Sequence, residues 1–423
     1  LSAQLQKIHA MLGTESFLFF FQLINNWPSS MIYLWDSTIR PNTHVFDVRY
    51  MSSPDNTSDG ILQLNSVSEF YRNFGSTVFT VCHEVNDNQN FTFEWQLLRH
   101  GVVVQARNGS QCSAQFNLIT DDEYQCTLRV RHSNGSITGT GSVDARREST
   151  WIVVIGDSFA SGEGNPDTPA ELTAPAKWID DTCRRSRHSF GWLVADDVAK
   201  RKTAQSVYLT FLACSGASAD RGILKPGNGQ LSQLEAIEKM SNARGRGPDL
   251  VLMTVGGNDI GFAEVLHSLQ KQKKEREVKS FDMRFFFVAH LLDQISSRLR
   301  AIGTKRVVLP LYYDITRNEQ EVIDASCEQF RKITTNRLAE AERQFFQRLN
   351  RLLLRKGLEF GWTVVESIPS IFASRGVCSS ISAIRSLDES SRMQGSQSGA
   401  FHPNALGHRL VADEILKLIE SRI

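Results

Sequence analysis

The fold of this chain is decided by one stretch, Trp151-Ile-Val-Val-Ile-Gly-Asp-Ser-Phe-Ala-Ser-Gly-Glu-Gly164. Its first five residues form an apolar and largely β-branched run, which predicts a buried strand. Gly156-Asp157-Ser158 then turns the chain, and the small residues that follow are typical of a helix N-terminus. α/β folds place a nucleophile here, at the carboxyl end of a buried strand. The alternative is an ordinary strand-to-helix turn in which Asp157 or Ser158 caps the helix.

Beyond this stretch, apolar runs alternate with segments of helical pattern. Four further strands are expected, at residues 206–212, 249–255, 305–311 and 362–365. Strands that alternate with helices predict a parallel sheet, here of five strands, with helices on both faces. The ligands of such a sheet bind beyond the carboxyl ends of its strands. We therefore expect an α/β domain over residues 150–423.

Polar motifs follow two of these strands and precede the last expected helix: Cys214-Ser-Gly-Ala217, Gly256-Gly-Asn-Asp259 and His402-Pro-Asn404. Together with Ser158 they supply what acyl transfer needs, namely a nucleophile, a base and donors for an oxyanion. Ser158 is the candidate nucleophile and His402 the candidate base. The candidate oxyanion hole consists of the N–H groups of Ser158 and Gly216 and the side-chain amide of Asn258.

Each of these residues also has a structural alternative. Asp157 is interpreted only as a holder of the turn and not as a catalytic acid. His402 can act as a helix cap, and Asn258 can stabilise its own turn. The chemical interpretation therefore depends on all four segments occurring together at one edge of the sheet.

The four blocks, in this order, resemble those of the SGNH (GDSL-type) hydrolases over about residues 150–423. The secreted esterase and lipase branch is resembled most closely, through Cys183-Arg-Arg-Ser186, Ala213-Cys-Ser-Gly-Ala217 and His402-Pro-Asn-x-x-Gly-His408. The resemblance implies a flavodoxin-like, three-layer sandwich and the hydrolysis of carboxylic esters without a metal or any other cofactor. It also implies a Cys183–Cys214 disulfide, which leaves Cys327–Cys378 as the remaining pair.

One position departs from the pattern of this family. Many members carry an aspartate three residues before the histidine, whereas this chain has Gly399 there. The local motif then lacks the acid that would determine the tautomer of His402. We favour a serine–histidine dyad in which a backbone carbonyl orients the imidazole. Asp388 is a more distant alternative.

The region before the α/β domain is predicted to contain a second fold. Cys82 is followed by Trp95 thirteen residues later and then by Tyr124-x-Cys126, a spacing that resembles the immunoglobulin fold. The resemblance covers residues 76–147. It implies a β-sandwich in which Trp95 packs on a Cys82–Cys126 bridge.

The same region carries signs of secretion. It holds four N-glycosylation acceptors, at Asn56, Asn90, Asn108 and Asn134. Acceptors beside pairable cysteines favour a secreted, oxidising setting. Cys112 is the odd cysteine, either free or competing for a partner. Residues 1–75 are poorly readable and β-rich, and their apolar run Phe17–Ile24 fits a secretory signal and a buried strand equally well.

Charge, apolar run length and cysteine spacing exclude several kinds of protein, and two classes of function are left. A net charge of +1 argues against a nucleic-acid partner, no apolar run is long enough for a transmembrane segment, and no Cys-x-x-Cys spacing indicates a metal site. The first class is a secreted ester hydrolase that acts on lipid or small acyl esters, or on acetylated glycans. The second is a non-catalytic extracellular binding protein with a relic hydrolase domain, whose N-terminal β module contacts protein or glycan.

Trp178 and Trp192 are interpreted as core residues, with stacking on a sugar or lining an acyl groove as the alternative.

Overall fold

The computed structural model describes residues 46–52, 61–62, 77–83, 91–110, 114–118, 122–146, 149–201, 206–227, 231–261, 278–330 and 333–420. These residues divide into two compact units. The first unit contains residues 46–52 and the described residues between 77 and 146. The second contains residues 61–62 and nearly all described residues from 149 onward.

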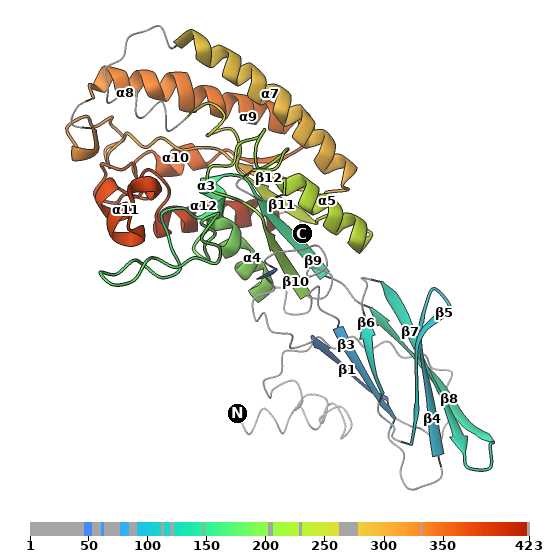
Figure 1. The fold of residues 1–423 in the computed structure, drawn as a ribbon. Coiled ribbons are helices and arrows are strands. Elements are labelled where there is room, and N and C mark those ends of the chain that lie inside the picture. Colours follow the sequence, from blue (N-terminus) through green and yellow to red (C-terminus); the bar gives the residue numbers. More distant parts are fainter. Residues whose placement is uncertain are drawn as a thin grey trace, which may run out of the picture. The chain divides into compact units, whose positions relative to one another are not determined.

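A six-stranded sheet forms the centre of the second unit, in the order β13-β12-β11-β9-β10-β2 (Figure 1). Its strands are β2 (Ile61–Leu62), β9 (Ser149–Ile155), β10 (Ser206–Phe211), β11 (Leu250–Met253), β12 (Val307–Pro310) and β13 (Thr363–Val365). The pairs β2–β10, β9–β11, β11–β12 and β12–β13 are parallel. The predicted five-stranded parallel sheet is therefore confirmed, and its strand order is that of flavodoxin-like folds. The short strand β2 extends the sheet beyond the prediction.

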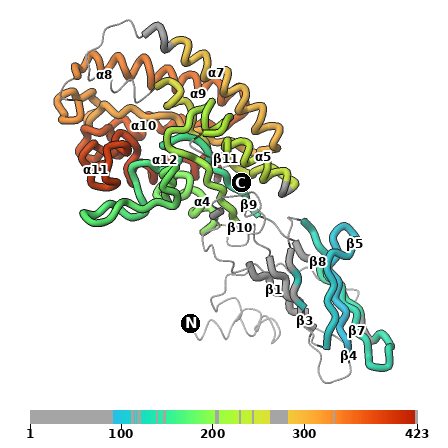
Figure 2. The backbone as a smooth tube through the Cα atoms, in the orientation of Figure 1, coloured from blue at the N-terminus to red at the C-terminus, as the bar shows by residue number. Residues whose placement is uncertain are grey.

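Helices cover both faces of this sheet. α4 (Phe190–Arg201) packs against α12 (Ala405–Glu420) on one face, and α5 (Gln233–Arg244) and α9 (Gln347–Phe360) pack against α7 (Val278–Ala301) on the other (Figure 1). The shorter helices are α3 (Ser158–Ser161), α8 (Thr335–Ala341), α10 (Ile368–Phe372) and α11 (Leu387–Gln394). Figure 2 follows this backbone from the green β10 to the red α11 and α12. Because both faces are covered, the side chains of Trp151–Ile155 in β9 are fully buried.

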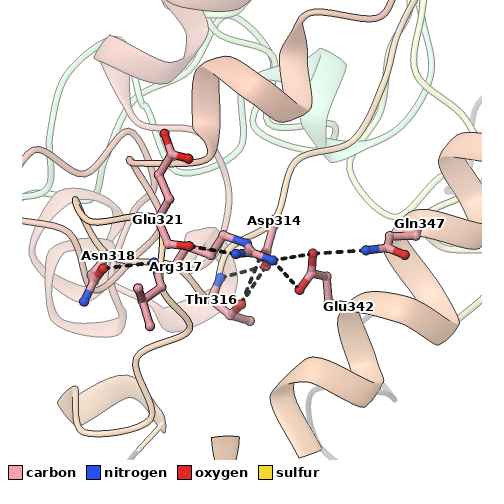
Figure 3. A network of polar contacts seen from close by, with 8 residues as sticks. Asp314, Thr316, Arg317, Asn318, Glu321, Glu342 and Gln347 are labelled. Atoms are coloured by element: carbon pink, nitrogen blue, oxygen red, sulfur yellow. Dashed lines mark hydrogen bonds and ion pairs between the residues drawn. The ribbon is translucent and has the colours of Figure 1, made fainter. Parts of the chain in front are cut away.

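A polar network holds the segment after β12 against the turn between α8 and α9 (Figure 3). Arg317 lies at its centre and donates to Asp314 at 2.9 Å and to both carboxylate oxygens of Glu342 at 2.8 Å. It also donates to the carbonyl oxygen of Glu321 at 2.7 Å. Glu342 begins the π-helical turn η3, and Gln347 donates to its carboxylate at 3.2 Å. One guanidinium thus forms ion pairs with two carboxylates and connects the segment after β12 to the π-helical turn.

The first unit consists of two antiparallel sheets. β1 (Phe46–Ser52), β3 (Thr77–His83) and β6 (Ala114–Leu118) form one sheet, in the order β1-β3-β6. β4 (Phe91–Arg99), β5 (Val102–Gly109), β7 (Glu123–His132) and β8 (Ile137–Arg146) form the other, in the order β5-β4-β7-β8. Alternate side chains of β4 and β7 share one apolar core with β6; its largest members are Phe93, Trp95, Leu97, Phe116 and Tyr124. β6 of the three-stranded sheet therefore buries Ala114 and Phe116 against the apolar face of the four-stranded sheet.

Cys126 corrects one prediction about this unit. It is a free, buried cysteine within the apolar core, so the predicted Cys82–Cys126 bridge is wrong. Apolar surroundings favour the neutral thiol, and burial raises the pKa of Cys126 to about 12. The spacing of cysteine and tryptophan predicts that Trp95 and Cys126 face the core. It does not determine which two sulfur atoms meet, because that depends on the geometry between strands.

Several predictions for the N-terminal region fall outside the described residues, namely those on Phe17–Ile24, Asn56, Asn90 and Cys112. Two glycosylation acceptors are described. Asn108 lies near the end of β5 and Asn134 in the turn between β7 and β8, and both are exposed. Exposure is what glycosylation requires, and the modification itself stays a prediction.

Candidate active site

The turn after β9 is held in one conformation by its surroundings. Gly156 has a φ of +125°, and a Cβ atom there would lie 2.3 Å from the carbonyl oxygen of Thr254, so only glycine fits. The side-chain amide of Gln233 accepts from the N–H of Gly156 at 2.7 Å and donates to its carbonyl at 2.9 Å. The start of α5 therefore positions the backbone just before Ser158.

Asp157 caps α3 and is buried beneath the turn. Its Oδ1 accepts from the N–H of Phe159 at 3.0 Å and from the hydroxyl of Thr254 at 2.7 Å. Its Oδ2 accepts from the hydroxyl of Tyr312 at 2.6 Å. Burial raises the pKa of Asp157, although these hydrogen bonds oppose the rise. The carboxylate thus joins the segments that follow β9, β11 and β12.

Ser158 and His402 lie in direct contact. The Oγ of Ser158 is 2.8 Å from Nε2 of His402, and Nδ1 of His402 is 3.0 Å from the carbonyl oxygen of Ala400. A carbonyl oxygen only accepts, so Nδ1 carries the proton and Nε2 is free to accept from the serine hydroxyl. Burial lowers the pKa of His402, which keeps the imidazole neutral and so able to accept a proton. Asp388, the distant alternative, is an exposed residue in the first turn of α11 and has no contact with His402.

The backbone around His402 is supported by aromatic residues. Phe401 has a φ of +64°, an unfavourable conformation for a residue with a large side chain. Its carbonyl oxygen accepts from the hydroxyl of Tyr313 at 3.2 Å. The ring of Phe159 lies 5.1 Å from the imidazole of His402, centroid to centroid. The strained backbone is therefore held in place from the β12 side of the site.

The candidate oxyanion donors lie on segments that are hydrogen-bonded to one another. The N–H of Cys214 donates to the carbonyl of Gly156 at 3.0 Å, and Nδ2 of Asn258 donates to the carbonyl of Ala217 at 2.8 Å. The second amide hydrogen of Asn258 remains for a ligand. Within the described part of the chain, the N–H groups of Ser158 and Gly216 have no acceptor.

Two disulfides stabilise this half of the molecule. Cys183 bonds to Cys214, next to the Ser215–Gly216 segment, and the N–H of Ser215 donates to the carbonyl of Cys183 at 3.0 Å. Cys327 bonds to Cys378. The first bridge therefore anchors the segment that carries Gly216.

The sequence patterns did not indicate several residues that build the site. Tyr312 and Gln233 hold the turn, and Asp259 accepts from the N–H of Ala219 at 3.1 and 3.0 Å. Burial and the nearby charge of Asp157 raise the pKa of Asp259 to about 6. One signal was available for Tyr312, because it follows a predicted strand and so lies at the carboxyl edge of the sheet.

A known family has the same arrangement of blocks. The sequence profile described as the GDSL-like lipase/acylhydrolase family matches residues 154–410, which contain the turn, the donor segments and His402. The chain belongs to this family. It is an esterase or lipase by that membership.

Individual relatives of this GDSL hydrolase are distant. A lipase of Streptomyces rimosus is 24% identical over 211 residues, which are 46% of this chain and 68% of the relative. The crystal structure of an extracellular lipase from Streptomyces rimosus is 21% identical, covers 65% of this chain and 100% of the other, and has a TM-score of 0.48. The structure of a family two carbohydrate esterase from Clostridium thermocellum is 12% identical, covers 82% and 92%, and has a TM-score of 0.32.

Proposed function

We propose that this GDSL hydrolase cleaves carboxylic esters through an acyl-enzyme on Ser158, with His402 as the base. The 2.8 Å contact between Oγ and Nε2 carries the proposal, because it gives the hydroxyl an acceptor in the correct tautomer. The bond from Nδ1 of His402 to the carbonyl of Ala400 supports it, since that bond orients the imidazole without an acid.

The reaction proceeds in two halves. Oγ of Ser158 attacks the ester carbonyl carbon while its proton moves to Nε2 of His402. The negative oxygen that forms accepts from the N–H groups of Ser158 and Gly216 and from the amide of Asn258. The ester C–O bond then breaks, and His402 returns the proton to the leaving alcohol. Water attacks the acyl-enzyme in the same way, which releases the acid and restores Ser158.

Labelling with a fluorescent fluorophosphonate tests this proposal. Wild type is expected to react, and Ser158→Ala and His402→Ala are expected to lose the label. Ser161→Ala is the matched control and is expected to keep it, because the hydroxyl of Ser161 donates to a backbone carbonyl at 3.2 Å. A folded, disulfide-intact wild type that takes no label favours the non-catalytic binding protein instead.

The acyl group of the substrate is a separate question. We propose lipid or small acyl esters as the substrates, with acetylated glycans as the alternative. Trp178 and Trp192 are both buried, and the guanidinium groups of Arg184 and Arg187 lie 5.5 and 5.3 Å from their ring centroids, which supports a core role for both. A series of p-nitrophenyl esters of increasing acyl length separates the two: activity restricted to acetyl esters supports deacetylation.

We also propose that the protein is secreted and that residues 76–147 form an immunoglobulin-like module before a hydrolase domain at 150–423. The two disulfides support secretion, and no described helix is long and apolar enough to cross a membrane. The shared core of Trp95, Tyr124 and Cys126 between two antiparallel sheets supports the module. Mass spectrometry of secreted protein for glycans at Asn108 and Asn134 tests the compartment.

A further inference from the structure

The contact between two glycines explains why the family's aspartate is missing at position 399. A Cβ atom on Gly399 would lie 2.5 Å from Cα of Gly164 and 2.6 Å from Oε1 of Gln394. A Cβ atom on Gly164 would lie 2.9 Å from the carbonyl oxygen of Gly399. The segment after α3 therefore occupies the space that an aspartate side chain at 399 would need.

The same segment carries a buried carboxylate, that of Glu163, which is 3% exposed. Its Oε1 accepts from Nε2 of Gln394 at 2.9 Å and from Oγ of Ser398 at 3.0 Å. The N–H of Gly164 donates to Oε1 of Gln394 at 3.0 Å. These bonds fasten the segment that ends at His402 to the segment that begins with Ser158, since the N–H of Glu163 donates to the carbonyl of Ser158 at 3.2 Å.

The buried carboxylate of Glu163 lacks a permanent cation within the described part of the chain. Among the described residues, no lysine or arginine forms an ion pair with this carboxylate. Burying a carboxylate without a counter-charge costs folding free energy. This cost is smaller when a nearby group can take up a proton and become positive. Such a group is His402, whose imidazole becomes positive each time it takes the proton of Ser158.

We propose that Glu163 is the acidic partner of His402: it positions the His402 segment and stabilises the imidazolium during each proton transfer. This inference rests on the proposed roles of Ser158 and His402. Glu163 acts through His402 and not on the substrate, so it is a positioning residue. The acidic residue thus lies on the nucleophile segment and not at position 399, and it acts on His402 through its charge, because Nδ1 of His402 donates to the carbonyl of Ala400.

The charges around His402 agree with this assignment. Burial alone raises the pKa of Glu163, but hydrogen bonds from Ser215, Gln394 and Ser398 and the charge of His402 lower it below its usual range. Glu163 is therefore ionised at the pH values at which neutral His402 acts as the base. Its charge opposes the lowering of the His402 pKa by burial, as does the charge of Asp157 to a smaller degree.

Two further titratable residues lie near His402, namely Arg385 and His408. The N–H of Arg385 donates to the carbonyl of His402 at 2.8 Å, and its guanidinium donates to Oδ1 of Asn165 at 2.6 Å. His408 is buried on α12, and burial lowers its pKa to about 3, so it stays neutral. It therefore adds no charge to the balance at the pH values of catalysis. Among the described residues, Glu163 and Asp157 are the charged side chains that act most strongly on the pKa of His402.

Steady-state kinetics on a p-nitrophenyl ester across pH test the inference with Glu163→Gln, Glu163→Asp and, as an exposed control, Glu171→Gln. Glu163→Gln is expected to lower kcat by roughly 10- to 100-fold, the effect of one close charge at protein dielectric, with little change in KM. The acid limb of kcat/KM is expected to move to lower pH, because the imidazolium loses its counter-charge. Glu163→Asp retracts the charge, so its limb lies between the two, and Glu171→Gln matches wild type.

Two results overturn the inference. One is a folded Glu163→Gln with wild-type kcat, and the other is a lowered kcat with an unmoved acid limb, which indicates only structural support. If Glu163→Gln does not fold by circular dichroism, an unmoved limb in folded Glu163→Asp is equally decisive. A wild type without activity or fluorophosphonate labelling refutes the roles of Ser158 and His402 themselves, so the two failures are distinguishable.

Discussion

Tyr312→Phe offers a sharp test of how the nucleophile turn is held, because it removes one hydroxyl and little else. That hydroxyl donates to Oδ2 of Asp157 at 2.6 Å and accepts from the N–H of Gly257 at 3.3 Å. The ring packs edge-on against Phe159, with centroids 5.0 Å apart, and phenylalanine keeps this packing. The substitution therefore isolates the two hydrogen bonds.

The expected loss of stability follows from these bonds. A hydrogen bond to a charged group contributes about 1.5–3 kcal/mol, and a buried N–H left without an acceptor costs about 1–3 kcal/mol. The two effects share one hydroxyl and partly overlap, so we expect a loss of about 3 kcal/mol in the free energy of unfolding.

The loss also depends on pH, with a definite sign. Burial raises the pKa of Asp157 in the folded state, so its ionised form is stabilised less by folding than its protonated form. Removing the Tyr312 hydroxyl raises this pKa further, because that bond favours the carboxylate. The destabilisation is therefore largest at neutral and alkaline pH. It becomes smaller as the pH falls and Asp157 takes up a proton.

Urea unfolding at pH 8 and at pH 5 measures both effects. Tyr313→Phe is the matched control, because its hydroxyl donates to the neutral carbonyl of Phe401 at 3.2 Å. We expect the control to lose about 1 kcal/mol at either pH. Equal losses in Tyr312→Phe and Tyr313→Phe, or a loss in Tyr312→Phe that grows toward pH 5, refute the reasoning.

Two further predictions concern the histidine side of the site. Burial lowers the pKa of His402 below 6.5, and the neutral imidazole is the base, so the midpoint of the acid limb of kcat/KM is expected below pH 6.5. A midpoint above pH 6.5 contradicts this. Gly399→Ala forces a Cβ atom against Gly164, so we expect a loss of about 1–3 kcal/mol in thermal or urea unfolding and a kcat more than about tenfold lower. Gly395→Ala is its control, because a Cβ atom there has no contact closer than 3.9 Å; its φ of +75° costs stability, but kcat is expected to match wild type. A wild-type kcat in Gly399→Ala contradicts the prediction that this contact positions His402.

The sequence by itself was sufficient for the features that local pattern encodes. The apolar run Trp151–Ile155 must be buried, and the alternation of strands and helices after it predicts a parallel sheet. The residues that follow parallel strands meet at one edge of the sheet, so the sequence alone groups Ser158, Gly216 and Asn258 into one set. Short-range periodicity and turn chemistry are local properties, and a sequence displays them directly.

Only the tertiary structure decided which side chains complete the site. Gln233 reaches Gly156 across 77 residues, Tyr312 reaches Asp157 across 155, and Gln394 reaches Glu163 across 231. No local pattern marks such pairs, because each depends on how packed helices and loops bring distant backbone together. The free Cys126 has the same origin, since a disulfide requires a specific distance between strands and not a spacing along the chain. Glu163 is a further example, because the contact between Gly164 and Gly399 leaves no room for a side chain at position 399. The acidic side chain near His402 therefore comes from the segment after α3.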